Sequence, residues 1–153
     1  MNRVWRMNRD VQVVIGEPDV SDEKYDLFLR YLEGQHDRTM GRSWEAFLDF
    51  LYDSPTETAE FTYWLGRRLI GVSIVDRVPT GLSSVYMFFD PASARRSLGT
   101  FSIVWEIEQV RRLGRPYYYL GYYVAGSQTM SYKARFRPNE VLVADDHWIR
   151  LGE

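Results

Sequence analysis

The chain has 153 residues, of which 45% are hydrophobic and 16% are aromatic, which indicates a globular domain with a sizeable core rather than a disordered chain. Its 19 basic and 21 acidic residues give a formal net charge of -2, so the overall charge gives no indication of nucleic-acid binding. Cysteine is absent, which excludes disulfides and thiolate metal sites, and the two histidines, His36 and His147, are too far apart in sequence to suggest a metal cluster.

Targeting and membrane signals are also lacking in the sequence. No run approaches the roughly 18 apolar residues of a membrane span, and the arginine-containing N-terminus has no hydrophobic signal segment. We therefore expect a soluble, cytoplasmic protein with no membrane partner. No internal repeat or long linker divides the chain, so we expect a single domain over residues 1–153.

The first third of the chain predicts one strand and two helices. Residues 11–15 (VQVVI) are typical of a strand, which Gly16 and Pro18 would end. Apolar residues at helical spacing predict a helix over 22–33 with Ser21 as its N-cap, and Ser43 is expected to cap a second helix that ends near Tyr52.

The remaining two thirds begin with β-rich sequence. Residues 61–65, 69–78 and 82–89 predict three strands that short turns join into an antiparallel meander. A helix over 98–113 follows, ended by Gly114, and its expected buried stripe is Ile103, Val104, Ile107, Val110 and Leu113. A strand over 117–123, a short helical piece around 130–136 and strands near 140–151 complete the chain. This order predicts an α+β protein with the GNAT acyltransferase fold, a mostly antiparallel sheet flanked by helices.

The junction between the third meander strand and the long helix is the first segment that suggests chemistry. Its residues are Arg95, Arg96, Ser97, Leu98, Gly99 and Thr100. A helix N-terminus with a glycine and two arginines can bind phosphate. The alternative is an ordinary helix start, with Ser97 as N-cap and solvated arginines. A strict acetyl-CoA loop usually carries a second glycine, but Phe101 and Ser102 stand where it would fall, which weakens a coenzyme A interpretation.

Two aromatic segments follow. In 117–123 (YYYLGYY), strand alternation would place Tyr118 and Tyr122 on one face, where their rings can stack on a base or their hydroxyls can donate to a carbonyl oxygen. Gly121 within the strand suggests close approach of a ligand; the alternative is a strand packed on both faces. Residues 130–138 (MSYKARFRP) place three cations beside two aromatic residues, which suits phosphate or carboxylate, unless they form a solvated helix face.

Acidic residues give weaker signals. Glu106 and Glu108 are two positions apart in the long helix and so point to different faces. Asp90 closes a strand beside the expected anion loop, where it can orient an attacking amine or serve as an Asp-Pro turn residue.

Taken together, these segments resemble the C-terminal domain of arginyl-tRNA–protein transferases and their bacterial leucyl relatives, over nearly the whole chain. The resemblance rests on residues 3–6 with 8–10, 82–91 (LSSVYMFFDP), 97–100, 106–107, 111–114, 116–122 and 130–138. Members normally carry a cysteine-containing N-terminal domain, which this sequence lacks. Near the basic segment the family often has a cysteine where Gly126 and Ser127 stand here.

The resemblance implies aminolysis of an aminoacyl-tRNA ester by the N-terminal amine of an acceptor protein that begins with Asp or Glu, as in N-degron protein degradation. Leucine is the favoured donor and arginine the alternative; no cofactor is expected, and a separate chain that supplies the N-terminal domain is a further expected partner. It implies Asp90, Tyr118 and Tyr122 as catalytic residues. The implied substrate-binding residues are Tyr86, Arg95, Arg96, Ser97, Leu98, Gly99, Thr100, Gly121, Tyr132, Lys133, Arg135 and Arg137.

Two other classes remain open. A small-molecule N-acetyltransferase that uses acetyl-CoA fits the same fold. A non-catalytic tRNA- or protein-binding module, or one half of a split transferase, fits a sequence without the N-terminal domain.

Overall fold

The computed structural model describes residues 2–35, 39–127 and 129–151, so His36 lies outside the described residues. The chain divides into two compact units, Met1–Tyr119 and Leu120–Glu153, which we call unit 1 and unit 2. The single domain that the sequence predicts over residues 1–153 stays a prediction.

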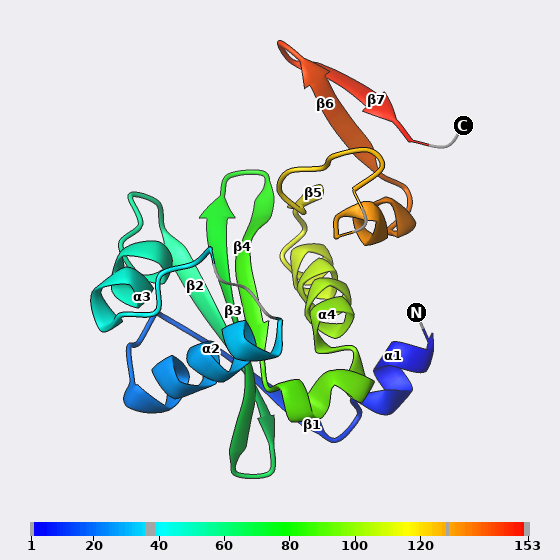
Figure 1. Cartoon of the computed structure of the whole chain (residues 1–153). Helices are drawn as coiled ribbons and strands as arrows, with labels where there is room; N and C mark the ends of the chain where they lie inside the picture. The colour runs from blue at the N-terminus through cyan, green and yellow to red at the C-terminus, as the bar shows by residue number, and fades with distance from the viewer. Residues whose placement is uncertain (1, 36–38, 128, 152–153) are drawn as a thin grey trace. The chain divides into compact units, whose positions relative to one another are not determined.

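Unit 1 is built on a five-stranded sheet whose strands follow one another in chain order (Figure 1). The first four strands are antiparallel, which confirms the predicted meander, and the short fifth strand runs parallel to the fourth. The strands are β1 (Val11–Gly16), β2 (Thr58–Leu65), β3 (Arg68–Val78), β4 (Gly81–Phe89) and β5 (Tyr117–Tyr119).

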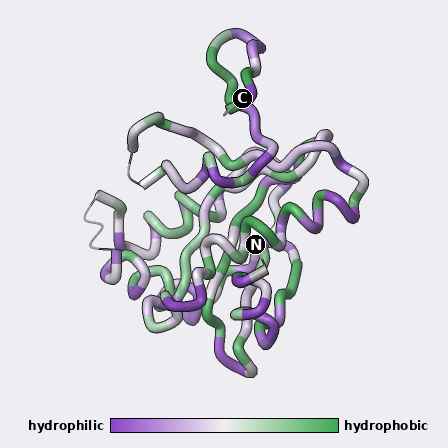
Figure 2. Tube along the Cα trace, turned by 90° about the vertical axis from the view of Figure 1, so that its right-hand side faces the viewer, coloured by the Kyte–Doolittle hydropathy of each residue, from purple (hydrophilic) through white to green (hydrophobic). Residues whose placement is uncertain are grey.

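The central strands are covered on both faces, which explains their continuous hydrophobic sequence. Seven consecutive residues of β3, from Leu69 to Val75, are buried. Figure 2 shows the strands as largely hydrophobic stretches with hydrophilic residues gathered in turns and on the helices.

One face of the sheet is covered by α2 (Asp22–Gly34) and α3 (Trp44–Leu51), as Figure 1 shows. The side chains of Ser21 and Ser43 accept hydrogen bonds from the first turns of these helices, which confirms both predicted N-caps. Phe28, Leu32 and Phe47 are buried against β3 and β4 in the core of this layer.

The other face is covered by α4 (Leu98–Arg112), with α1 (Asn2–Met7) beside it. Ile103, Val104 and Val110 are buried as predicted, but Leu113 is 62% exposed. The prediction for Leu113 was wrong because α4 ends at Arg112, and Gly114, with φ +65°, then turns the chain toward β5. The sequence did not predict α1, because six residues are fewer than two helical turns and show no repeated apolar pattern.

The strand predicted over 117–123 is shorter than expected. It ends at Tyr119, and Gly121 has φ +75°, which is incompatible with a regular strand. Tyr118 and Tyr122 therefore do not share a strand face, and they belong to different units.

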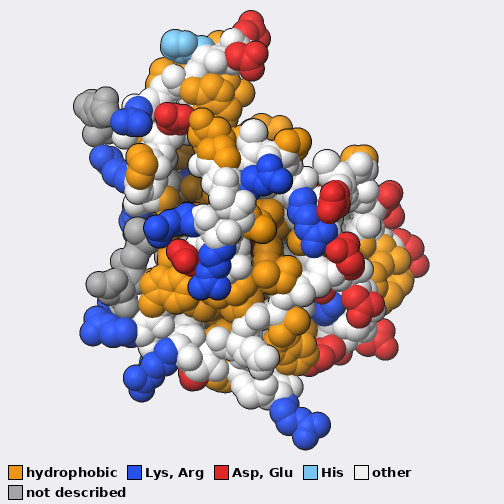
Figure 3. Space-filling view, turned by 180° about the vertical axis from the view of Figure 1, so that it is seen from behind, with side chains coloured by type: hydrophobic (Ala, Val, Ile, Leu, Met, Phe, Trp, Pro, Cys, Tyr) orange, Lys and Arg blue, Asp and Glu red, His pale blue; other side chains and the backbone are white. Residues whose placement is uncertain are grey.

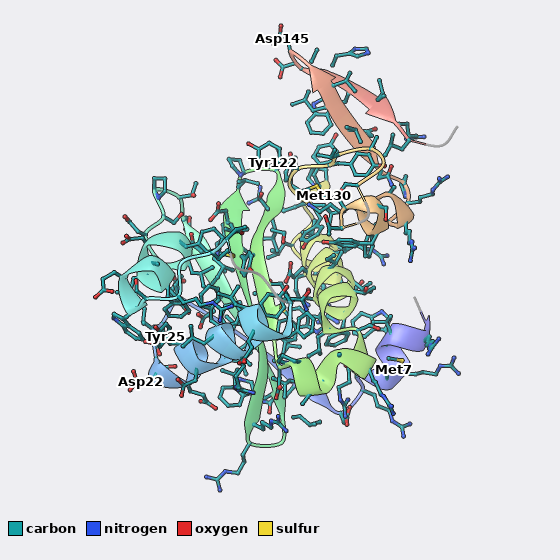
Figure 4. All side chains as sticks on the ribbon, in the orientation of Figure 1. Met7, Asp22, Tyr25, Tyr122, Met130 and Asp145 are labelled. Atoms are coloured by element: carbon teal, nitrogen blue, oxygen red, sulfur yellow. The ribbon has the colours of Figure 1, made fainter. Side chains whose placement is uncertain are left out.

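Unit 2 contains a short 3-10 helix and a two-stranded hairpin, which confirms the predicted helical piece and the closing strands. The elements are η2 (Ser131–Arg135), β6 (Glu140–Ala144) and β7 (His147–Arg150), with Asp145 at the hairpin tip (Figure 4). Leu142, Val143, Trp148 and Ile149 are exposed on this hairpin, where Figure 3 shows hydrophobic side chains at the top of the view. Across both units, none of the described helices combines the length and the apolar character that crossing a bilayer requires.

Candidate functional site

The N-terminus of α4 is open to an anion. Ser97 lies in the left-handed region (φ 54°, ψ 48°), and its side chain forms no capping hydrogen bond, so the predicted capping by Ser97 is not observed. Its carbonyl oxygen accepts from the amides of Thr100 and Phe101, while its own side chain leaves the first turn uncapped. Uncapped amides at the positive end of a 15-residue helix are suited to bind phosphate.

Gly99 lies in this first turn and is not required there by the packing of the protein itself. A Cβ atom at this position would meet only the ring of Phe89, at 3.9 Å, which is an ordinary van der Waals distance. Leu98, in contrast, is fully buried and anchors the start of the helix in the core. The space over Gly99 is therefore open to a ligand.

The two arginines before α4 have different roles. Arg96 forms a two-pronged ion pair with Asp10, with N–O distances of 2.7 and 3.0 Å, and also donates to the carbonyl of Met7 at 2.9 Å. Arg95 is exposed at the end of the 3-10 helix η1 (Pro91–Arg96). The structure thus assigns Arg96 to holding the loop, and Arg95 is the arginine exposed beside the helix N-terminus.

Asn8 supports the same loop from the N-terminal segment. Its amide nitrogen donates to the carbonyl of Arg96 and to that of Val4, both at 2.9 Å, and the residue is 2% exposed. The sequence indicated Asn8 and Asp10 only through the family resemblance. Both side chains bind Arg96, at the start of the loop before α4, and are 86 or more positions away from it in sequence. No local pattern reveals such contacts.

Asp90 is almost completely buried, and its carboxylate is bound by groups of the protein itself. It accepts from the amide of Ala92 at 3.0 Å, pairs with Arg30 at 3.2 Å and forms a close ion pair with Arg68. Burial opposes ionisation, but the Ala92 amide and the two guanidinium groups outweigh it and lower the pKa of Asp90. These contacts favour the turn interpretation of Asp90; its predicted role in orienting an amine stays a prediction.

Replacing Asp90 with asparagine is expected to lower the free energy of unfolding by about 1–3 kcal/mol at pH 7. Because the pKa of Asp90 is lowered in the folded protein, its stabilisation is present above the unfolded pKa of about 3.9 and disappears as the pH falls through the folded value. Urea unfolding at pH 7 and pH 3, beside the exposed control Asp53→Asn, measures this. An equal loss at both pH values would contradict the electrostatic explanation.

The sheet is interrupted beside α4, where β4 and β5 separate. β5 pairs with β4 only through Tyr117, Tyr118 and Tyr119, opposite residues 81–83. The register between β3 and β4 then shifts so that Val85 is an extra residue, a β-bulge, and its side chain is 42% exposed. Bulges next to a strand that ends often mark functional sites, because they redirect the backbone.

Tyr86, predicted to bind substrate, follows this bulge but points into the aromatic layer under α2 and α3. Its ring lies 6.2 Å from that of Tyr31 and 5.0 Å from that of Phe50. Its hydroxyl donates to the sulfur of Met40 at 3.3 Å. These contacts favour a packing role for Tyr86.

A carboxyl group with three hydroxyl partners lies in the interior of unit 1. Glu106 of α4 is 1% exposed, and its Oε1 accepts from Tyr63 of β2 at 3.1 Å and from Ser73 of β3 at 2.6 Å. Its Oε2 accepts from Tyr118 of β5 at 2.5 Å. Burial raises the pKa of Glu106 to about 7, although the three hydroxyl bonds act in the opposite direction.

The sequence contains a signal for this buried group, although Glu106 was not among the predicted site residues. Glu106 is three positions after Ile103 and four before Val110, both of which are buried, so helical periodicity places it on the core face. Glu108 points elsewhere, as predicted, and pairs with Arg111 and Arg112.

A second set of buried charged residues joins α2 to β2. Lys24 forms a close ion pair with Glu60 of β2 and donates to the carbonyl of Asp19, while the hydroxyl of Tyr52 donates to Glu60 at 2.9 Å. The pair borders a pocket of about 310 Å³ between α2, β1 and β2. None of these residues was singled out from sequence. Among the described residues, no group of three or more acidic or histidine side chains is arranged to hold a metal ion.

The remaining predicted residues belong to unit 2. Tyr122 is 90% exposed, and its carbonyl oxygen accepts from the ammonium group of Lys133 at 2.7 Å (Figure 4 labels Tyr122). Burial lowers the pKa of Lys133 and raises that of Tyr132. Arg135 and Arg137 are exposed. Gly121, Tyr122, Tyr132, Lys133, Arg135 and Arg137 thus form one set within unit 2, and the α4 loop with Tyr118 forms another within unit 1.

Comparison with known proteins decides the family. The family model described as "Arginine-tRNA-protein transferase, C terminus" matches residues 23–143. This chain belongs to that family. The matched segment extends from the start of α2 into β6 and includes both sets of predicted site residues.

Individual relatives agree with this assignment. An aspartate/glutamate leucyltransferase of Nitrosococcus oceani is 40% identical over 154 residues, and one of Pseudomonas paraeruginosa is 37% identical over 151 residues. The matches include 99% and 97% of this chain. The chain spans 64% of the length of each of these relatives.

Similar solved structures confirm the GNAT fold. The ribosomal-protein-S18-alanine N-acetyltransferase from Escherichia coli matches with a TM-score of 0.59 and 14% identity, covering 86% of this chain and 80% of that one. An aminoglycoside acetyltransferase from an uncultured soil metagenomic sample matches with a TM-score of 0.61 and 9% identity, covering 94% and 98%. At such identities the likeness concerns the fold alone.

Proposed function

We propose that this chain is the acyl-transferring part of an aminoacyl-tRNA–protein transferase. It would move leucine, or alternatively arginine, from aminoacyl-tRNA to the N-terminal Asp or Glu of acceptor proteins, and so mark them for degradation as N-degrons. The observation that carries the proposal is the uncapped N-terminus of α4, with exposed Arg95 and open space over Gly99, in a chain of this family. The names of the leucyltransferase relatives support leucine as the donor.

The reaction requires positioning more than strong base catalysis. The α-amine of a protein N-terminus has a pKa of about 7.7–8.0, so a useful fraction is neutral at pH 7. The enzyme must then hold ester and amine together and stabilise the oxyanion that develops on the carbonyl. In this proposal, Arg95 and the α4 amides bind a phosphate of the tRNA 3′ end, and Tyr118 faces the ester.

The basic segment of unit 2 supplies the second recognition element. Residues 120–139 contain three basic residues, Lys133, Arg135 and Arg137, and no acidic residue, in a chain whose net charge is -2. Exposed Tyr122 and Tyr132 offer rings on which bases can stack. We propose that this segment receives the acidic side chain of the acceptor or holds the tRNA.

Replacing Arg135 with alanine is expected to reduce transfer more than about tenfold without unfolding the protein, because its guanidinium is exposed and one charge-assisted contact contributes about 1.5–3 kcal/mol. Initial rates with acidic peptides, together with a thermal melt of the variant, measure both parts. Unchanged transfer would remove Arg135 from the site.

The direct test incubates the purified chain with radiolabelled leucyl-tRNA or arginyl-tRNA and peptides that begin with Asp, Glu or Ala. Label on the Asp and Glu peptides, and none on the Ala peptide, is the expected result, and the productive tRNA identifies the donor. No label from a folded chain would overturn self-sufficient transfer. Binding of tRNA without transfer would identify a binding module instead, and calorimetric binding of acetyl-CoA would favour an acetyltransferase.

A further inference from the structure

The Glu106 cluster is unusual because its carboxyl group has hydroxyl partners and no cation. Among the described residues, no lysine, arginine or histidine forms an ion pair with Glu106. The titratable groups that face it from the strands packed against α4 are Tyr63 of β2 and Tyr118 of β5, with the hydroxyl of Ser73 from β3. A buried carboxylate without a counter-ion is costly, and a pKa near 7 allows it to gain and lose a proton at neutral pH.

Tyr118 is the member of the cluster that can connect Glu106 to a substrate. Tyr63 is fully buried and Ser73 is 1% exposed, so their hydroxyls hold the carboxyl group from inside the protein. Tyr118 is only partly buried, and it lies in β5 where that strand separates from β4, next to the bulge at Val85. Glu106 lies eight residues into α4, roughly 12 Å along the helix axis from the proposed phosphate site.

We propose that Glu106 is a positioning residue and the proton acceptor of Tyr118, so that the two together remove the proton from the attacking amine. This inference rests on the proposed function, in which Tyr118 faces the aminoacyl ester. It adds a residue that is too deeply buried to touch substrate and that acts through the Tyr118 hydroxyl.

The proton transfers balance over one turnover. The amine nitrogen attacks the ester carbonyl carbon and a C–N bond forms. A proton of this nitrogen passes to the Tyr118 oxygen while the phenolic proton passes to Oε2 of Glu106. When the C–O bond to the ribose breaks, Tyr118 gives a proton to the departing ribose oxygen and takes one back from Oε2 of Glu106. The products are an amide and an alcohol, and Glu106 ends as the carboxylate with which it began.

Transfer kinetics of matched variants test the proposal. Glu106→Gln and Tyr118→Phe are each expected to lower kcat by about 10²–10⁴-fold with little change in KM for the peptide, the usual contribution of a positioned acid–base group. The double variant should be no slower than the slower single variant, because both act in one proton path. The wild-type rate should rise with pH through a pKa near 7 as well as through that of the acceptor amine, about 7.7–8.0, and only the amine step should remain in Glu106→Gln. Glu108→Gln, on the same helix but directed at Arg111 and Arg112, should match the wild type.

A second measurement is independent of activity and of the variant Glu106→Gln. The side-chain carboxyl ¹³C signal of Glu106 in the wild-type chain is expected to titrate near pH 7, and in Tyr118→Phe at higher pH, because a hydrogen bond that stabilises the carboxylate is lost. A carboxyl group that titrates below pH 5, or a folded Glu106→Gln variant within threefold of the wild-type rate and with the same pH profile, would overturn the inference. A wild-type chain that transfers no label would instead overturn self-sufficient transfer, and the titration would still test whether Glu106 exchanges a proton near neutral pH, as the inference requires.

Discussion

Replacing Lys24 with methionine is expected to lower the free energy of unfolding by about 3–5 kcal/mol at pH 7, because the carboxylate of Glu60 would stay buried without its cation. The side chains of Lys24 and Glu60 are 10% and 4% exposed, so solvent cannot replace the lost partner. Guanidinium unfolding followed by tryptophan fluorescence measures the difference. Arg111→Met, which removes an equal charge at a 77% exposed side chain, should change stability by no more than about 0.5 kcal/mol.

The pH dependence of the Lys24 variant provides an internal check. Burial raises the pKa of Glu60 even beside Lys24, which acts in the opposite direction. A carboxyl group whose pKa is raised on folding stabilises the protein below its unfolded pKa of about 4.3, and this stabilisation is lost as the pH rises through the folded value. Without Lys24 the folded pKa of Glu60 rises further, so the variant should be nearer to wild-type stability at pH 4 than at pH 7.

A double variant distinguishes the free-energy cost of leaving Glu60 unpaired from the cost of losing the packing of the Lys24 side chain. Adding Glu60→Gln to Lys24→Met removes the unpaired charge and keeps an acceptor for the Tyr52 hydroxyl, so it should recover most of the lost stability at pH 7. If Lys24→Met alone costs less than about 1 kcal/mol, the pair is solvated in solution and the explanation from burial is wrong.

Reversing the charge of Arg95 has the largest effect that we expect on the binding of aminoacyl-tRNA. Arg95→Glu should reduce transfer about a hundredfold, mainly through a higher KM for aminoacyl-tRNA, because a carboxylate would replace a phosphate-binding cation at the N-terminus of α4. Stability should be nearly unchanged, since the side chain is exposed. In Arg95→Ala, the slope of log binding constant against log salt concentration should fall by about 0.7, the value for one phosphate contact on a single strand.

Two further variants localise the effect to this helix end. Gly99→Ala should leave stability within about 0.5 kcal/mol of the wild type, because the added Cβ meets only Phe89 at an ordinary distance, yet it should weaken tRNA binding if a phosphate approaches the backbone there. Arg111→Glu makes the same charge reversal near the opposite end of α4. A loss in Arg111→Glu equal to that in Arg95→Glu would indicate general attraction of tRNA to positive charge rather than a site.

Local sequence patterns determined most of the elements of unit 1. Ser21 and Ser43 mark the helix starts because a side-chain oxygen at that position satisfies a free backbone amide, and continuous β-branched and aromatic runs mark buried strands. The family resemblance was likewise contained in short segments of sequence. These features depend on residues within a few positions of each other, which a sequence displays directly.

The true length of β5 depended on tertiary context. Seven residues from Tyr117 to Tyr123 have strand-forming composition, yet only three pair with β4, and Gly121 turns the chain away from strand geometry. Pairing depends on the neighbouring strand, so propensity overstated the strand and wrongly placed Tyr118 and Tyr122 on one face.

What each predicted site residue does was likewise decided by partners distant in sequence. Arg95 and Arg96 are adjacent and chemically alike, but Asp10 occupies Arg96 and leaves Arg95 exposed. Asp90 is paired with Arg30 and Arg68. Burial raises the pKa of Glu106 to about 7, while hydroxyls from three strands hold its carboxyl group. The sequence by itself determined which residue types and which elements this protein has; only the tertiary structure decided which charges are neutralised, since burial and ion pairing join residues that the chain keeps far apart.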